Sequence, residues 1–485
     1  MSGNIRILRF AEAQGSSESA LGRNMKKGTL AVKTTTTKSL MALALMFWAH
    51  TAWSYTVSGN TYTTNGSQSD VQAAVNAAPD NGSVTVVIPN GTYSWTGALT
   101  ITKSLALAGA SASGVTINNN FNGALITATS SVNGHINIYW LNIITAFKML
   151  SGTGYASLIC DRTEPSNYTV LVHDCTFDSQ AYFVFPVYFY ANGIVMWNCN
   201  FPGTGGGAVC LTGIDLECAK YGVTSSWNTA DTWGTQDTTG LRNSYVENCT
   251  FANGTSSAGN AEDSSRVVWR YNSMTNAEIS SHGWDTGYAG VRQMEIYNNT
   301  FVNASGISSS GGNNCWVSVN GGPAVVFNNA MQDLPSKSGV QLNVASIRRE
   351  DAIPCQTGYP AARQVGQSWS ASSSVPFGNP PVSSGGVGTI TEGVYVWGNT
   401  GTEISDSNYV GLNQFEPDQC GNGQLIVNYV QRNRDYFVGT AKPGYTPYTY
   451  PHPLHTQYAL SGAGGTPTPT ATPAVPLAPQ NLRVQ

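Results

Sequence analysis

A short motif recurs along the middle of the chain, and each copy runs from an apolar strand through Asn, Asp or a small residue to a closing Phe or Met. The closing residues are Phe177, Phe201, Phe251, Met274, Phe301 and Met331. The steps between these positions are 24, 50, 23, 27 and 30 residues, and we interpret the step of 50 as two units with a weaker copy between them. A repeat of this length predicts a solenoid, in which each unit packs on its neighbours.

The composition of each unit favours strands over helices. Val, Ile, Tyr and Trp dominate the apolar part, and an Asn or Asp followed by a small polar residue is typical of a turn. No copy places apolar residues at helical spacing, and the 52 glycines of the chain suit tight corners better than helix interiors. We therefore predict an all-β coil of parallel strands, with successive rungs roughly 4.8 Å apart.

Alignment of the copies predicts three columns of side chains. The turn column consists of Cys175, Cys199, Cys249, Asn272, Asn299 and Asn329. Stacked Asn side chains can bond to one another along the axis, and the cysteines replace them with small buried apolar groups. Strand alternation directs a second column inward: Val172, Met196, Val246, Trp269, Ile296 and Val326. The third column is expected to face solvent: His173, Trp197, Glu247, Arg270, Tyr297 and Phe327.

The N-terminal part completes the pattern. Residues 69–78 are predicted to form a short capping helix, and 84–93 and 99–109 have the composition of first rungs. With these segments, residues 55–460 resemble the right-handed parallel β-helix proteins of the pectate lyase-like superfamily. The resemblance implies a right-handed single-stranded parallel β-helix with an N-terminal capping helix, and about 25 residues per coil give roughly 12–15 coils. That superfamily is functionally mixed, so the fold alone assigns no activity.

The two ends of the chain predict export and a modular layout. Residues 1–54 resemble an over-long start followed by a secretory signal, with a Lys-rich stretch, an apolar core and Ala52-Trp53-Ser54 as the cleavage site. A membrane anchor is the alternative, although the apolar stretch is too short to span a bilayer. The β-helix domain with its C-terminal capping loops is assigned to 55–460, a Thr/Pro linker to 461–478, and a truncated start of a fibronectin type III-like module to 479–485.

The net charge limits the classes of binding partner, and the cysteine content bears on disulfide bonds. Removal of 1–54 takes seven of 23 basic and two of 27 acidic residues, which leaves 16 and 25 and a net charge of -9. Nucleic acid is therefore excluded as an expected partner, and we predict a secreted or surface-bound monomer within a longer multimodular chain. Nine cysteines permit disulfides in an exported protein, for which the candidate pairs are Cys210 with Cys218, Cys315 with Cys355, and Cys175 with Cys199. Free buried thiols are the alternative for the last pair.

Charged residues are scarce but concentrated. They make up 10% of the chain, yet one segment of 34 residues holds eight of them: Glu262, Asp263, Arg266, Arg270, Glu278, Asp285, Arg292 and Glu295. His282 lies within the same segment, and the register predicted above adds Glu247 and Tyr297 as neighbours on the coil surface. A shallow groove lined by acids, arginines and aromatic rings suits an extended polysaccharide.

Cleavage of a uronate-containing glycan by β-elimination would use these residue types. Such a lyase neutralises the uronate carboxylate with a cation, removes the adjacent proton with a base and expels the linked oxygen. The resemblance implies acidic ligands for Ca2+ and an Arg or Lys base. We accordingly assign Glu262 and Asp263 to a Ca2+ site, Arg266, Arg270, Arg292, His282 and Asp285 to uronate binding and proton transfer, and Glu247, Glu295 and Tyr297 to substrate binding.

Several alternatives stay open at this stage. Glu247 and Arg270 can form a cross-rung ion pair of small energetic value, and Glu262-Asp263 can be a solvated turn. A glycoside hydrolase would need paired carboxylates, such as Glu247 with Glu295 or Asp263 with Asp285. A non-catalytic surface or matrix protein that binds glycan or a protein partner is the rival from another class. Residues 444–454, rich in Tyr and Pro, are predicted to pack over the coil and cap it, unless their tyrosines contact sugar rings.

Overall fold

The computed structural model describes the coil and the C-terminal segment that follows it. The described residues are 54–121, 123–128, 134–145, 155–160, 168–179, 185–189, 193–202, 214–217, 237–241, 243–252, 258–262, 266–277, 279–281, 293–303, 315–319, 322–333, 341–344, 367–369, 389–401, 410–411 and 431–459. The predicted signal, the Thr/Pro linker and the truncated module lie outside them, except for the cleavage-site residue Ser54.

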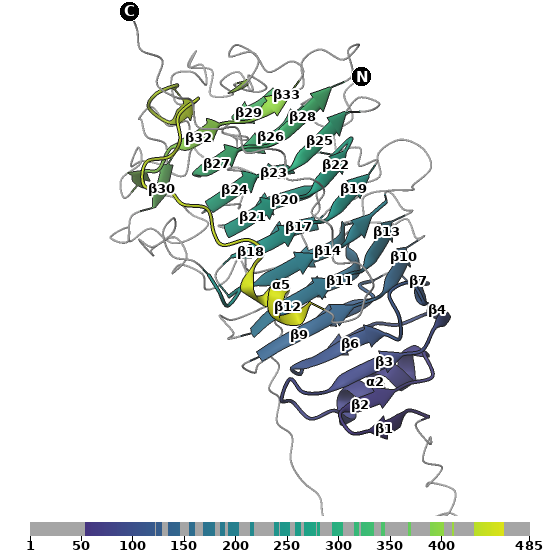
Figure 1. The fold of residues 1–485 in the computed structure, drawn as a ribbon. Coiled ribbons are helices and arrows are strands. Elements are labelled where there is room, and N and C mark those ends of the chain that lie inside the picture. Colours follow the sequence, from purple (N-terminus) through teal and green to yellow (C-terminus); the bar gives the residue numbers. More distant parts are fainter. Residues whose placement is uncertain are drawn as a thin grey trace, which may run out of the picture. The chain divides into compact units, whose positions relative to one another are not determined.

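The described chain winds into a right-handed parallel β-helix with three sheets, as predicted (Figure 1). Sheet A contains, in spatial order, β1 (Thr56–Ser58), β2 (Thr61–Thr63), β3 (Thr85–Ile88), β6 (Leu105–Gly109), β9 (Gly134–Tyr139), β12 (Tyr168–His173), β15 (Ile194–Trp197), β18 (Ser244–Glu247), β21 (Arg266–Arg270), β24 (Gln293–Tyr297), β27 (Ala324–Phe327), β32 (Val394–Trp397) and β35 (Tyr436–Val438). All its neighbours pair in parallel except β1 with β2.

The two remaining sheets of the coil each contain ten strands. Sheet B contains β4 (Gly91–Trp95), β7 (Val115–Asn119), β10 (Asn142–Thr145), β13 (Thr176–Ser179), β16 (Asn200–Phe201), β19 (Thr250–Ala252), β22 (Ser273–Thr275), β25 (Thr300–Asn303), β28 (Ala330–Asp333) and β33 (Thr400–Gly401). Sheet C contains β5 (Leu99–Ile101), β8 (Ile126–Ala128), β11 (Tyr155–Cys160), β14 (Phe185–Phe189), β17 (Ile214–Glu217), β20 (Gly259–Glu262), β23 (Ile279–Ser281), β26 (Cys315–Val319), β29 (Gln341–Val344) and β34 (Val410–Gly411). A separate antiparallel pair joins β30 (Gln367–Trp369) to β31 (Thr389–Thr391).

The described residues complete ten three-strand coils, fewer than the 12–15 expected. The expectation assumed a constant coil length, but some coils carry long connections. In particular, Met196 pairs directly with Val246 and Phe201 with Phe251, so the step of 50 residues is one coil. The weaker copy inferred within that step is therefore wrong, because the extra length lies between strands of the same coil.

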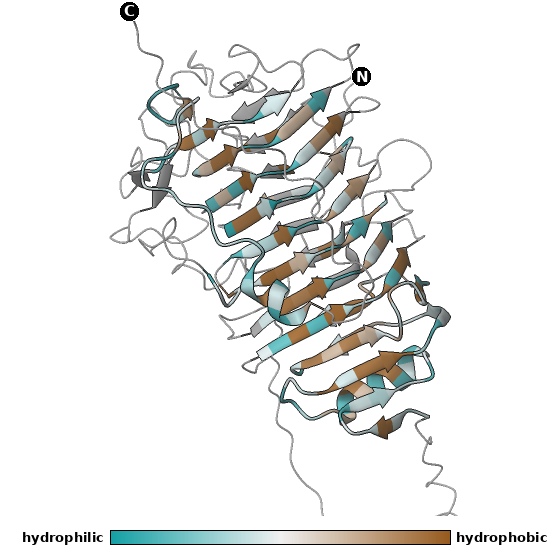
Figure 2. Ribbon diagram, viewed as in Figure 1, coloured by the Kyte–Doolittle hydropathy of each residue, from teal (hydrophilic) through white to brown (hydrophobic). Residues whose placement is uncertain are grey.

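The predicted columns have the predicted register, and the column expected to point inward fills the interior. Val246, Trp269 and Ile296 pair in succession and belong to the buried core. Inside sheet B, Phe177, Phe201 and Phe251 stack with ring centroids 5.3 and 4.7 Å apart. Figure 2 shows hydrophobic residues along the strands of successive coils. Repetition of the motif thus produces a continuous apolar core along the axis.

The turn column forms the expected Asn ladder, in which each side chain bonds to the next coil. The Nδ2 of Asn272 donates to Oδ1 of Asn299 at 2.9 Å, Asn299 donates to Asn329 at 3.0 Å, and Asn329 donates to Asn399 at 2.8 Å. Asn399 is a further copy that the sequence alignment missed. The described cysteines of the column, Cys175, Cys199 and Cys249, are free and buried.

A left-handed backbone residue precedes each ladder position and turns the chain from sheet A to sheet B. These residues are Asp174, Asn198, Asn248, Tyr271, Asn298 and Asn328, with φ between 51° and 58°. Asn and Asp tolerate this conformation better than other non-glycine residues. The corner therefore favours the Asn or Asp of the motif, although Tyr271 and, before Asn399, Gly398 take the same conformation.

The helix α2 (Gln68–Ala77) covers the first coil, as predicted for 69–78. Ser67 caps its N-terminus, and Val71 and Val75 join the core of the coil. Asp70 is buried and accepts backbone N–H bonds from Ser54, Tyr55 and Asn65 at 2.8–3.2 Å. These bonds attach the chain that precedes β1 to the helix. Among the described residues, no helix is long and apolar enough to cross a membrane.

Candidate functional site

The outer face of sheet A carries the charged residues that the sequence assigned to substrate, but they are buried. Glu247, Arg270 and Glu295 are 0% exposed, Tyr297 is 1% exposed and Arg266 is 4% exposed. The expectation that the column from His173 to Phe327 faces solvent is therefore wrong, although all its members point away from the coil interior. The cause is a cover from a distant part of the chain.

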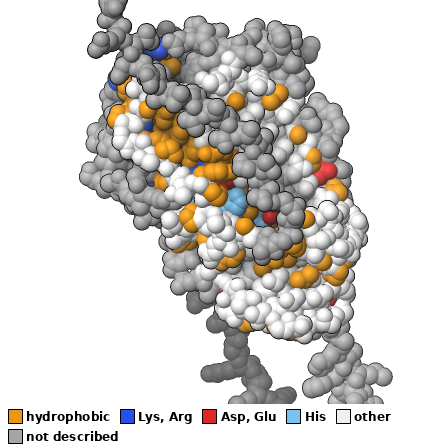
Figure 3. Space-filling model, viewed as in Figure 1, with side chains coloured by type: hydrophobic (Ala, Val, Ile, Leu, Met, Phe, Trp, Pro, Cys, Tyr) orange, Lys and Arg blue, Asp and Glu red, His pale blue; other side chains and the backbone are white. Residues whose placement is uncertain are grey.

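That cover is residues 445–458, which we call the C-terminal strap. It follows β35, runs back along the outer face of sheet A and ends in the helix α5 (Pro453–Tyr458) (Figure 1). Its Tyr448 and Leu454 belong to one buried cluster with Val268, Tyr297 and other outward residues of sheet A. Figure 3 shows hydrophobic side chains gathered in a band on this face, with charged atoms visible only in small spots. The prediction that 444–454 packs over the coil is confirmed, but it covers the side of the coil.

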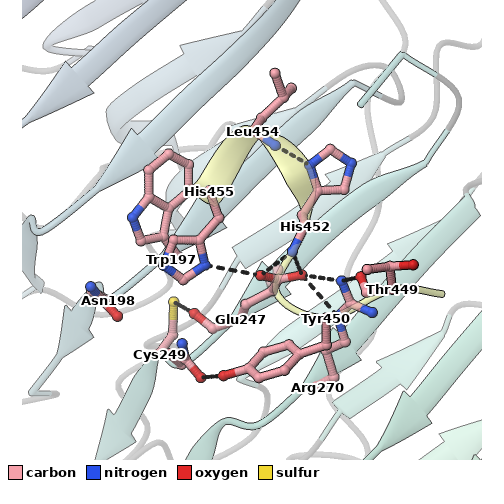
Figure 4. A network of polar contacts seen from close by, with 12 residues as sticks. Trp197, Asn198, Glu247, Cys249, Arg270, Thr449, Tyr450, His452, Leu454 and His455 are labelled. Carbon is pink, nitrogen blue, oxygen red and sulfur yellow. Dashed lines mark hydrogen bonds and ion pairs between the residues drawn. The ribbon is translucent and has the colours of Figure 1, made fainter. Parts of the chain in front are cut away.

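Arg270 lies at the centre of the contacts between sheet A and the strap (Figure 4). Its guanidinium forms a fully buried ion pair with Glu247 on the preceding coil. It also donates to the main-chain carbonyls of Tyr448 at 2.8 Å and Thr449 at 2.9 Å, and to the hydroxyl of Tyr297 at 2.8 Å. A buried charge loses its hydration, and hydrogen bonds from several partners have to compensate for this loss. All the partners named here for Arg270 belong to its own chain.

Glu247 receives donors from both the coil and the strap. Besides Arg270, the backbone N–H of His452 donates to its two oxygens at 3.2 and 3.3 Å, and Nδ1 of His455 lies 3.2 Å from Oε2. Burial alone would raise the pKa of Glu247, but the charge of Arg270 and the hydrogen bonds from His455 and Arg270 lower it below the ordinary value. The carboxyl is therefore ionised beneath the strap.

Glu295, two coils beyond Glu247, has a different environment. Its carboxyl accepts from the hydroxyl of Tyr445 at 2.5 Å and from Nε2 of Gln293, which also donates to the hydroxyl of Tyr448 at 3.1 Å. Burial raises the pKa of Glu295 to about 7, against the lowering effect of these donors. Two carboxylates on one covered face thus differ in protonation near neutral pH.

Aromatic rings extend this face on either side of the charged centre. His173 stacks between Tyr139 and Trp197 with centroids 5.0 and 4.2 Å away, and His455 of the strap stacks on Trp197 at 4.9 Å. Farther along the axis, Phe327 stacks between Tyr297 and Trp397 at 4.6 and 4.4 Å. The outer face of sheet A is therefore a row of flat rings interrupted by an Arg–Glu pair.

The remaining predicted site residues lie on the sheet C side of the coil or outside the description. Glu262 is the last residue of β20, but its side chain is outside the described set, as are Asp263, His282, Asp285 and Arg292. The structure therefore brings together Glu247, Arg270, Glu295 and Tyr297 but does not test the Ca2+ site or the proton-transfer pair. The described residues contain no cluster of three or more potential metal ligands.

The backbone of sheet C provides one placement that sequence spacing did not reveal. In the parallel pairing of β17 with β20, Glu217 is the partner of Glu262. In the next coil, Asn260 pairs with Ser280 and Ala261 with Ser281, the last residue of β23. Two acidic positions thus lie at the C-terminal ends of strands on adjacent coils, β17 and β20. On the next coil, β23 ends at Ser281, and the sequence continues into 282–292, which contains His282.

The strap residues and Gln293 were missed as members of the covered network. The Tyr- and Pro-rich composition of 444–454 predicted packing against the coil, but nothing in that segment indicates which coils it contacts. Asp237 and Asn243 were also missed: Asp237 accepts from the backbone N–H of Asn243 at 2.9 Å, and its own carbonyl oxygen lies 2.6 Å from Nε2 of His452. The position of Asp237 shortly before the strand that contains Tyr245 and Glu247 was the available signal.

Comparison with known proteins adds little beyond the fold. No family model matches the sequence, and no curated protein matches it. Among solved structures, the chain is similar to the PL6 family polysaccharide lyase Pedsa3628 from Pseudopedobacter saltans, with 10% identity and a TM-score of 0.35 over 80% of this chain and 94% of that chain. A similarity at this level does not bear on activity.

Substitution of Glu295 by Gln should remove a pH dependence of stability. The folded-state pKa of about 7 is above the unfolded value of 4.5, so the folded state holds the proton more tightly. The stabilisation is fully present below pH 4.5 and is lost as the pH rises through 7, by about 3 kcal/mol. Urea denaturation of the wild type and the variant at pH 5 and pH 8 measures this effect, because the other titrating groups are the same in both proteins and cancel in the comparison. If the two proteins differ in free energy of unfolding by the same amount at pH 5 and pH 8, the prediction is contradicted.

Proposed function

We propose that the chain is a secreted polysaccharide-active protein that cleaves a uronate-containing glycan by β-elimination, at the C-terminal ends of the sheet C strands β17 and β20. The observation that carries this proposal is the pairing of Glu217 with Glu262 on adjacent coils, next to the segment that contains His282, Asp285 and Arg292. The sheet A residues Arg270 and Arg266, first candidates for uronate binding, are replaced in this role by Arg292, because both are buried and Arg270 is bonded to Glu247 and to the strap.

In this proposal, acidic residues at the C-terminal ends of β17 and β20 hold a Ca2+ ion. Carboxylates are preferred ligands of this cation, and parallel pairing places Glu217 and Glu262 about 4.8 Å apart along the axis. Asp263 follows Glu262 directly in the sequence and adds a third acidic residue. Neighbouring carboxylates repel one another, and a bound cation would remove this repulsion. When bound, the ion would supply the positive charge that offsets a uronate carboxylate. In this proposal Arg292 orients the uronate, and His282 with Asp285 accepts the proton next to the carboxylate.

A non-catalytic glycan-binding protein is the second candidate. It is favoured by the outer face of sheet A, where the strap bonds to Glu247, Arg270 and Glu295 and so gives these charged residues a structural role. The closed structure does not support a hydrolase built on Glu247 and Glu295, because with the strap in place both carboxyls are 0% exposed and are not open to water. Asp263 and Asp285 remain the other hydrolase pair, outside the described residues.

The lyase proposal is tested with the secreted chain and a panel of uronic-acid polymers, with and without Ca2+, by the absorbance of the unsaturated product. We expect Glu262→Gln to raise the Ca2+ concentration that gives half-maximal activity by at least about tenfold, because one anionic ligand is lost. Glu392→Gln, a carboxylate change beside sheet A, is the matched control and should leave this concentration unchanged. Absence of product on every polymer, together with retention on a glycan column, would overturn the lyase and favour the binding protein.

A further inference from the structure

The strap contacts Arg270 and Glu247 largely through its main chain, besides the side chain of His455 on Glu247. Arg270 donates to two carbonyl oxygens, those of Tyr448 and Thr449, and Glu247 accepts from the N–H of His452. These contacts do not depend on which residues the strap contains at those positions. Any extended chain with acceptors and donors at the same spacing could make them, and the hydroxyls of a sugar chain serve in both capacities.

The cover also leaves polar atoms of this face without partners. Among the described residues, buried Nε2 of His173 and Oε1 of Gln293 have no hydrogen-bond partner, and both residues are 0% exposed. Buried polar atoms in a permanent interface are nearly always paired. Replacement of a buried ion pair by apolar residues is often neutral or stabilising, so Arg270 and Glu247 are poorly explained as mere attachment points. The face is thus better equipped for polar ligands than the strap requires.

The connector between β35 and the strap lies at the surface, and the N–H of Gly439 at its start donates to the carbonyl of Val396 in β32 at 2.7 Å. Residues 439–444 are exposed or half-buried, and the segment begins and ends with Gly439 and Gly444, at φ 75° and 70°. Neither glycine has an atom within 4 Å of the position a Cβ would occupy. Short segments that absorb backbone rotation in this way act as hinges in lid movements.

We propose that the strap is a displaceable cover over a glycan-binding site on the outer face of sheet A. The sugar hydroxyls would take the places of the strap carbonyls on Arg270 and of the strap N–H on Glu247. The ring of Trp197, on the coil before Glu247, stacks on His455 of the strap, and this face would be open to a sugar ring once the strap has moved. The glycan class rests on the proposed function, whereas the movement of the strap does not depend on bond cleavage.

Hydrogen exchange of the intact secreted chain tests this directly, with polygalacturonate and alginate as acidic polymers and dextran as the neutral control. Binding should make the backbone amides of His452 and Leu454 exchange at least about tenfold faster, while the amides of the ladder residues Asn299 and Asn329 stay protected. Strap amides that are unchanged or slower when a polymer is bound would overturn the proposal, even if the polymer is cleaved. Faster strap exchange without cleavage would sustain it and count against the lyase alone.

A point variant provides a second, independent measurement. Tyr450 is 37% exposed, stacks on Tyr271 at 3.6 Å and donates to Oδ1 of Asn248 at 2.6 Å. Tyr450→Ala should loosen the strap and lower the apparent Kd for the acidic polymer about fivefold or more, because closure reduces the fraction of binding-competent protein. Tyr450→Phe, which keeps the ring, should have a smaller effect. Weaker binding by Tyr450→Ala would overturn the proposal and identify Tyr450 as a sugar contact.

Discussion

Replacement of Arg270 by Met should lower the free energy of unfolding by about 3–5 kcal/mol, because it leaves the carboxylate of Glu247 buried without its main partner. His455 and the N–H of His452 remain close to that carboxylate, but they cannot replace a guanidinium that donates from both Nε and Nη2 to Oε1. The strap also loses the donors to Tyr448 and Thr449. Urea denaturation followed by tryptophan fluorescence measures the loss.

Two further variants identify the cause. Arg434→Met removes an ion pair in which the Arg side chain is 32% exposed and the buried carboxylate of Asp435 keeps the backbone N–H of Gln431 as a donor, so it should cost less than Arg270→Met. The double variant Arg270→Met with Glu247→Leu should be more stable than Arg270→Met alone, because no uncompensated charge stays buried. If the double variant is as unstable as the single one, packing by the Arg side chain and not the charge is responsible.

Replacement of Asn299 by Ala should have an effect of similar size in the centre of the ladder. Its Oδ1 accepts from the backbone N–H and Nδ2 of Asn272, both at 2.9 Å. Its Nδ2 donates to the carbonyls of Trp269 and Tyr297 and to Oδ1 of Asn329. The variant leaves several of these buried groups unpaired, at about 1–3 kcal/mol each, so we expect a loss of about 3–5 kcal/mol in the free energy of unfolding.

The matched control for the ladder is Asn60→Ala. Asn60 is an exposed turn residue between β1 and β2, and a surface change of this kind should stay within about 0.5 kcal/mol. Hydrogen exchange adds a spatial test, because the Asn299 variant should lose protection first at the turns of adjacent coils. Equal stability of the two variants would show that the ladder bonds contribute no more than water does.

The repeating motif contained enough information for the fold because its period specified both pairing and direction. Aligned positions such as Glu247, Arg270 and Tyr297 are paired neighbours in the structure, as the spacing predicted. Coil length was less predictable, since Phe327 pairs with Trp397 across 70 positions of sequence. Parallel pairing constrains where a strand lies but sets no limit on the loop before it.

The environment of the candidate site could not be predicted for a different reason. Whether an outward side chain is exposed depends on what covers it, and the cover of Arg270 comes from residues 178 and 179 positions away. Local alternation distinguishes inward from outward, and it was right for every aligned residue of sheet A. It carries no information on which other segments pack over the strand. The sequence therefore predicts Arg270 as an exposed ligand-binding residue, whereas in the structure it is a buried ion-pair partner.

The closed strap also changes how a coil of this type should come apart. In a simple solenoid each coil interacts only with its neighbours, so the array can fray from either end one coil at a time. Here a single segment bonds to Glu247 in β18, Arg270 in β21 and Glu295 in β24, which ties three successive coils to one another. These coils are therefore expected to melt together as one cooperative block, while the coils nearer α2 respond independently.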